Sequence, residues 1–188
     1  MLTREDLVKS ASDTIFGKPL ITNVYRSVIV EALVAVALPD WQWVSADYFE
    51  HDFLHADGTR LEVKQSAMKQ TWATKGTAKP AWDIAERKQV WKDDRWVPMA
   101  GRHADIYVLA LHDVVDETAD HREPSQWKFL VIPTFKLPTA KKIGLGPASR
   151  LSDLVDVDGL SAAVAEASRK HSLATRMSWQ SGDLEKIE

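Results

Sequence analysis

The sequence predicts a mixed α/β (α+β) fold in which helices flank a central mixed β-sheet. Two observations favour this fold: helical patterns open and close the chain, and apolar β-rich runs dominate its middle. The chain has 188 residues, 45% of them hydrophobic, so it can bury a sizeable core. We expect a single domain over residues 1–188, with N-terminal helices in 3–38, a sheet core in 41–135 and a C-terminal helical segment in 147–172.

Local signals along the chain justify the individual elements. The segment from Thr3 to Ile15 indicates an amphipathic helix, because Thr3 can cap it and Asp6 lies three residues further on. The other expected elements are a helix over 22–38, a strand over 41–48, a hairpin around residues 57–58, strands over 82–85, 104–111, 127–133 and 143–145, and helices near 149–154 and 161–171. We expect loops over 69–80 and 113–123, an irregular segment over 89–99, and fraying of the last ten residues.

The net charge of −3 conceals an uneven distribution along the chain. From Arg60 to Arg102, ten Lys and Arg stand against five Asp and Glu, a local charge of +5, and the remainder carries −8. An asymmetry of this kind is typical of a nucleic-acid-binding face. The alternative is an ordinary surface of mixed charge.

Cysteine is absent, which excludes disulfide bonds, a thiol nucleophile and thiolate-bound zinc. Charged side chains, from Arg4 to Lys9, interrupt the first ten residues, so we expect no signal-peptide core there. The longest apolar run, 32–38, is too short to cross a bilayer. These features predict a cytoplasmic protein without a membrane partner.

The stretch "HDFLHADGTRLEVKQSA" places charged residues on both arms of the expected hairpin. Because side chains alternate along a strand, Glu62 and Lys64 share one face, and Val63 turns to the core. A two-residue turn at Asp57-Gly58 would pair Asp52 with Val63 and direct it to the core. We expect instead a three-residue loop or a bulge, which pairs Asp52 with Lys64, because an unpaired buried aspartate is costly.

Two carboxylates on one face suit a divalent cation. Asp52 and Glu62 would repel each other by roughly 4 kcal/mol at an effective dielectric constant of about 20, and a hard cation turns that repulsion into binding. Mg²⁺ favours one or two carboxylates together with waters and phosphate oxygens, a setting for the attack of water on phosphorus. Lys64 would orient that water and stabilise the transition state. The alternative is a solvent-facing hairpin whose ion pairs contribute less than about 1 kcal/mol.

Glu31 is an acid in an otherwise apolar helical stripe that also contains Val24, Val28 and Ala35. A carboxylate in such a stripe needs a cation, a backbone donor or a metal-bound water as its partner, or else forms a salt bridge at the edge of the stripe. The segment after Lys64 is basic and aromatic, as expected of a platform that stacks bases and contacts phosphates. The alternative is that its tryptophan packs on the sheet edge and its lysines are solvated. The candidate nucleic-acid-binding residues are Gln65, Lys69, Gln70, Trp72 and Lys75.

The order of these residues resembles the PD-(D/E)xK, or restriction-endonuclease-like, nuclease superfamily. The likeness spans roughly residues 20–135 and is most specific in "EVKQSA..QTW". The segments that carry it are "NVYRSVIVEALV", "HDF", "LEVKQSAMKQTW", "WDIAE", "RHADIYVLALH" and "QWKFLVIP", which look like an uncharacterised prokaryotic group of that superfamily. The resemblance implies an αβββαβ-type core and phosphodiester hydrolysis that depends on a divalent metal. Asp52 and Glu62 would then bind the metal, Lys64 would assist the water, Glu31 would be an auxiliary acid, and Gln65 would extend the motif.

We therefore predict a nuclease that depends on Mg²⁺ or Mn²⁺ and acts on DNA, with Glu31, Asp52, Glu62 and Lys64 as its catalytic residues. A homodimer is expected if both strands are cut. The competing predictions are a catalytically inactive nucleic-acid-binding or assembly subunit that retains the nuclease fold, and a purely structural partner protein.

Overall fold

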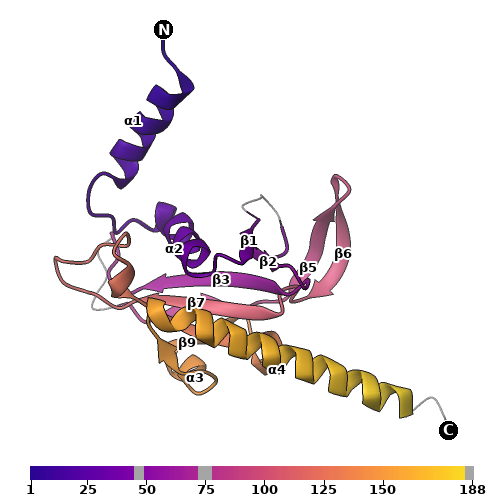
Figure 1. The fold of residues 1–188 in the computed structure, drawn as a ribbon. Coiled ribbons are helices and arrows are strands. Elements are labelled where there is room, and N and C mark those ends of the chain that lie inside the picture. Colours follow the sequence, from indigo (N-terminus) through magenta and orange to yellow (C-terminus); the bar gives the residue numbers. More distant parts are fainter. Residues whose placement is uncertain (45–48, 72–77, 185–188) are drawn as a thin grey trace.

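The expected α+β architecture with a central mixed sheet is confirmed (Figure 1). The computed structural model describes residues 1–44, 49–71 and 78–184. Its main sheet has the strand order β1-β2-β3-β7-β8-β10, in which β3 and β7 run parallel and the other neighbours antiparallel. The strands are β1 (Trp41–Trp43), β2 (Phe53–His55), β3 (Arg60–Ala67), β7 (Ile106–His112), β8 (Trp127–Pro133) and β10 (Leu154–Val155).

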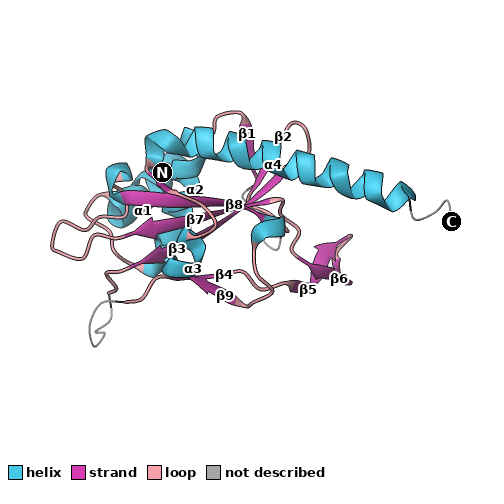
Figure 2. Ribbon diagram, turned by 90° about the horizontal axis from the view of Figure 1, so that it is seen from below, coloured by secondary structure: helices cyan, strands magenta, loops and turns pink. Residues whose placement is uncertain are grey.

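Helices cover one face of the main sheet. The helices α2 (Asn23–Ala37) and α4 (Val157–Leu184) pack against it through Val30 and Leu160, which are completely buried. The second half of α4 extends beyond the sheet, as Figures 1 and 2 show. Alternation along β3 sends Leu61 and Val63 to this face, as the sequence predicts.

A second apolar cluster covers the opposite face. It includes Trp82 of β4 (Ala81–Asp83) and Ile143 of β9 (Lys142–Gly144), which form a separate two-stranded ribbon, and Ala148 of α3 (Leu145–Ser149). The buried Trp82 indole also donates to the carbonyl of Ala110 at 3.0 Å. Both faces of the main sheet are therefore covered, which explains why every residue of β7 is buried.

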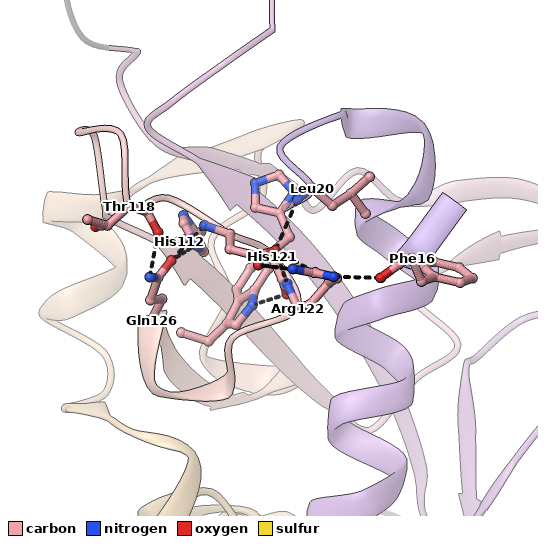
Figure 3. A network of polar contacts seen from close by, with 9 residues as sticks. Phe16, Leu20, His112, Thr118, His121, Arg122 and Gln126 are labelled. Atoms are coloured by element: carbon pink, nitrogen blue, oxygen red, sulfur yellow. Dashed lines mark hydrogen bonds and ion pairs between the residues drawn. The ribbon is translucent and has the colours of Figure 1, made fainter. Parts of the chain in front are cut away.

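The N-terminal segment attaches to the body through the loop that precedes β8. Helix α1 (Arg4–Phe16) begins with the expected Thr3–Asp6 capping box, contains no buried residue and projects away from the sheet (Figure 1). Behind it, the backbone N–H of His121 donates to the carbonyl of Leu20, and Arg122 donates to that of Phe16 (Figure 3). The segment 113–123 is thus a loop, as predicted, but it is not exposed throughout.

Three expectations for the elements are wrong. Residues 89–99 are not irregular, because β5 (Arg87–Lys92) and β6 (Arg95–Gly101) form an antiparallel hairpin. The helix expected near 149–154 lies earlier, at α3. The C-terminal helix begins before residue 161 and continues to Leu184, so residues 179–184, for which fraying is expected, are helical, and residues 185–188 lie outside the described residues. Of the strand expected over 41–48, residues 41–43 are confirmed and 45–48 lie outside the described residues. Among the described helices, none combines the length and apolar character that a membrane span requires.

Candidate functional site

The hairpin between β2 and β3 brings Asp52 and Glu62 together. Its strands pair Phe53 with Leu61, and the turn closes through a hydrogen bond from the His55 N–H to the Thr59 carbonyl at 2.9 Å. The loop therefore has three residues, 56–58, as predicted. It lies one residue earlier than the pairing of Asp52 with Lys64 requires. That pairing is wrong: the paired register ends at Phe53 and Leu61, and Asp52 lies beside Leu61 and Val63, where the charge of Glu62 acts on its carboxyl group.

Backbone hydrogen bonds hold Asp52 at the start of β2. Its N–H donates to the Leu61 carbonyl at 3.0 Å, and its carbonyl accepts from the Val44 N–H at 2.9 Å. One carboxylate oxygen, Oδ2, accepts from the Val63 N–H at 2.7 Å. Burial and the nearby charge of Glu62 raise the pKa of Asp52 to about 7, against the opposing effect of the Val63 hydrogen bond. Asp52 thus retains its proton far more readily than an ordinary aspartate.

Glu62 is buried, with only 4% of its surface exposed. Its Oε1 accepts from the ammonium of Lys64 and lies 3.7 Å from the guanidinium of Arg87. Its Oε2 is inaccessible to solvent and has no hydrogen-bond partner among the described residues. The alternative of a solvent-facing hairpin is therefore wrong at Glu62. A buried carboxylate oxygen without a donor is costly, so this atom is an unfilled acceptor position.

Glu31 approaches the same group of charges from helix α2. Its Oε2 accepts from the indole N–H of Trp43 at 3.1 Å. Burial raises the pKa of Glu31, the Trp43 hydrogen bond opposes that rise, and the charges of Glu62 and Lys64 both act on it. The partner is thus a neutral indole donor, which the sequence did not predict. The stripe assigned to Glu31 is also wrong, because Val24 is exposed and the buried face of α2 carries Arg26, Val30 and Val34.

Three of the five predicted nucleic-acid-binding residues, Gln65, Lys69 and Gln70, have partners within the protein. The buried guanidinium of Arg26 donates to the side-chain oxygens of Gln65 and Gln70. Lys69 donates to the Asp116 carbonyl at 2.6 Å and lies 3.4 Å from Glu117. Trp72 and Lys75 lie outside the described residues. A role for these five residues in binding nucleic acid stays a prediction.

The four predicted catalytic residues thus form one electrostatically coupled group: the pKa of Asp52 responds to Glu62, Glu31 and Lys64. No protein-family model matches the chain, and no curated protein matches it. Within residues 1–44, 49–71 and 78–184, the structure holds no set of three or more His, Asp or Glu side chains arranged around a common metal position. The function must therefore be argued from two carboxylates and the cations beside them.

Sequence reasoning missed Arg87 and Arg26. Arg87 reaches Glu62 from β5 and also donates to the Phe49 carbonyl at 2.8 Å. The only local hint is its position directly after the "WDIAE" segment. Arg26 could have been found, because it precedes the buried Val30 by four residues and so occupies the core-facing stripe of α2.

Proposed function

We propose that this protein is a metal-dependent nuclease with a restriction-endonuclease-like core that hydrolyses phosphodiester bonds, with DNA as its substrate. The observation that carries the proposal is the juxtaposition of Asp52 and Glu62. One of these carboxylates has a pKa raised to about 7, and the other has a buried oxygen without a hydrogen-bond partner in the described part of the chain. The mixed sheet and the helix bearing Glu31 agree with the superfamily resemblance.

Asp52 and Glu62 fit a hard divalent cation. A site for Mg²⁺ needs only one or two protein carboxylates, since waters and phosphate oxygens complete the coordination. A cation there would offset the repulsion that raises the Asp52 pKa and would give Glu62 Oε2 a partner. When bound, Mg²⁺ or Mn²⁺ supplies a Lewis acid that draws charge from the phosphate and lowers the pKa of water. Binding would release the proton of Asp52.

The remaining residues position charge around the scissile phosphate. The side chain of Lys64 is about one-third exposed, at 32%, so its ammonium can turn toward substrate while Glu62 keeps Arg87 as a second cation. In this role Lys64 holds the attacking water and stabilises the negative charge that grows on the phosphate. Glu31 is an auxiliary acid, and Trp43 sets its orientation through the indole hydrogen bond.

One observation favours a second candidate function, a nucleic-acid-binding subunit that retains this fold without cutting. Lys64 and Arg87 already compensate the charge of Glu62, and the described residues supply no third metal-ligating side chain. Such a subunit would bind nucleic acid with strong salt dependence and no metal requirement.

Cleavage of labelled linear, nicked and single-stranded DNA with Mg²⁺ or Mn²⁺ tests the proposal. Glu62→Gln should reduce cleavage at least about 100-fold, a loss that even groups in indirect contact with a metal can cause. Glu166→Gln, which changes a half-exposed acid on α4 outside the candidate site, is the matched control and should cut like the wild type. Divalent metal should also raise the Tm of the wild type but not that of Glu62→Gln, by linkage to folding. DNA binding without cleavage under either metal would favour the non-catalytic subunit.

A further inference from the structure

The hairpin of β5 and β6 is a projecting basic and aromatic ribbon beside the candidate site. Figures 1 and 2 show it standing apart from the main sheet. It starts at Arg87, whose guanidinium lies 3.7 Å from Glu62 and donates to the Phe49 carbonyl. Any strand held against Asp52 and Glu62 therefore passes the base of this ribbon. We call residues 87–101 the arm.

One face of the arm carries two tryptophans. Trp91 and Trp96 are register partners whose rings meet edge to face, with centroids 5.3 Å apart. Their exposed fractions are 40% and 45%, although the neighbouring Val90 is buried at 1%. Because neighbours on a strand point to opposite sides, Val90 anchors the inner face and the two indoles lie on the outer one. Exposed indoles of this kind offer flat apolar surfaces on which bases stack.

The tip of the arm carries two cations. Lys92 and Arg95 are also register partners, so an ammonium and a guanidinium lie side by side across the ribbon. Like charges in directly opposite positions are unfavourable. In the part of the chain that the structure describes, no ion pair neutralises either of them, although Asp93 and Asp94 form the turn between them. An anion would relieve this repulsion.

We propose that the arm binds unpaired nucleotides next to the scissile phosphate. Trp91 and Trp96 stack bases, and Lys92 and Arg95 contact phosphates. Unpaired nucleotides fit better than a closed duplex, because the duplex hides its base faces and the arm puts its indoles and its tip cations on opposite faces. The inference rests on the proposed function, since it takes the strand direction from a phosphate held at Asp52 and Glu62.

Binding to a fluorescein-labelled oligothymidylate and to a blunt duplex, measured by anisotropy in EDTA, tests the arm without cleavage. Trp91→Ala with Trp96→Ala should weaken binding to the single strand by about tenfold or more. Trp91→Phe with Trp96→Phe should retain most of it, which separates stacking from misfolding. Phe135→Ala, an exposed aromatic outside the arm, is the control.

The cations are tested by salt dependence. Lys92→Glu with Arg95→Glu should lower the slope of log K against log salt by about 1.4, since two phosphate contacts on a single strand contribute about 0.7 each. Lys136→Glu with Arg150→Glu makes the same charge change on exposed residues elsewhere and should leave affinity near that of the wild type. Losses in the two control variants, Phe135→Ala and Lys136→Glu with Arg150→Glu, that equal those in the arm variants would overturn the inference, and so would equal effects on duplex and single strand.

The proposals for the arm and for the nuclease activity can be contradicted separately. Binding that depends on the arm, together with no cleavage on adding Mg²⁺ or Mn²⁺, supports the arm and removes only the proposed catalysis. Cleavage with wild-type affinity in both arm variants removes the arm and leaves the catalysis.

Discussion

At the scale of single residues, the main feature of the molecule is its buried carboxyl groups. The side chain of Asp52 accepts a backbone hydrogen bond from Val63 and lies near the charges of Glu62 and Glu31. Burial disfavours the charged form of a carboxyl group, so it raises the pKa values of both Asp52 and Glu31. Without a cation, ionisation of Asp52 above neutral pH therefore opposes folding.

This effect predicts how stability depends on pH. Between its ordinary pKa and about 7, Asp52 keeps its proton in the folded chain and loses it in the unfolded chain. The free energy of unfolding should therefore fall as pH rises through this window and level off above it. Asp52→Asn keeps the acceptor for Val63 and cannot ionise, so its advantage over the wild type should grow with pH, to on the order of 1 kcal/mol or more by pH 8.

Urea unfolding in EDTA at several pH values measures this difference. The control is Asp57→Asn in the turn, because hydrogen bonds from Thr59 lower the pKa of Asp57 to about 2. Asp57 stabilises the fold above its ordinary pKa, and that contribution disappears as pH falls toward 2, so its replacement should cost stability at neutral pH. A pH-independent gap between Asp52→Asn and the wild type would contradict the raised pKa.

At the scale of elements, two turns set the geometry of the candidate site and of the arm. The Gly58 turn, with a φ of 89°, sets the register that pairs Phe53 with Leu61 and so brings Asp52 near the charge of Glu62. The Asp93-Asp94 turn makes the arm a tight two-residue hairpin, with φ values of 51° and 56°. Left-handed conformations are unfavourable for residues with a Cβ, and Asn-Gly is the preferred pair in such turns.

The arm turn can therefore be improved. Asp93→Asn with Asp94→Gly should stabilise the hairpin by on the order of 1 kcal/mol, because it relieves two left-handed residues and keeps the register. Thermal unfolding should show a higher Tm in the double variant. The reversed order, Asp93→Gly with Asp94→Asn, should gain less, and a lower Tm for Asn-Gly would show that the aspartates serve another purpose there.

The whole molecule depends on the two apolar layers that enclose the main sheet. Among the described side chains of helix α4, those that join the core lie in its first half: Leu160 is fully buried, whereas Leu173, farther along the helix, is 59% exposed. Asp105 connects the main sheet to helix α4 at one end, because it pairs with Arg60 of β3 at 2.9 Å and lies 3.5 Å from His171 of α4.

Substitutions along α4 should therefore differ sharply. Leu160→Ala removes buried methyl groups and should lower the free energy of unfolding by about 2–5 kcal/mol. Leu173→Ala, the same change on the same helix, should cost no more than about 0.5 kcal/mol, as is usual for exposed positions. Urea unfolding of both variants measures this, and similar losses would mean that the outer half of α4 also packs against a partner.

The sequence by itself determined the α+β class, the position of most elements and the four acidic and basic residues, Glu31, Asp52, Glu62 and Lys64, from which the candidate site is built. Asp52, Glu62 and Lys64 were predictable as neighbours because strand periodicity is local, and a glycine turn fixes which faces coincide. The length of the loop, three residues, was predictable for the same reason, but the loop lies one residue earlier along the chain than the sequence predicted.

Only the tertiary structure decided how those residues are paired and buried. Glu62 is buried where its register partner is Tyr107 of β7 and the guanidinium of Arg87 lies 3.7 Å away, and Glu31 accepts a hydrogen bond from Trp43, twelve positions away. The turn of the arm consists of two aspartates with left-handed backbone conformations. Neither position is a glycine, so the local sequence did not indicate such a turn. Burial and pairing depend on segments far apart along the chain, and local sequence patterns contain no information about such distances.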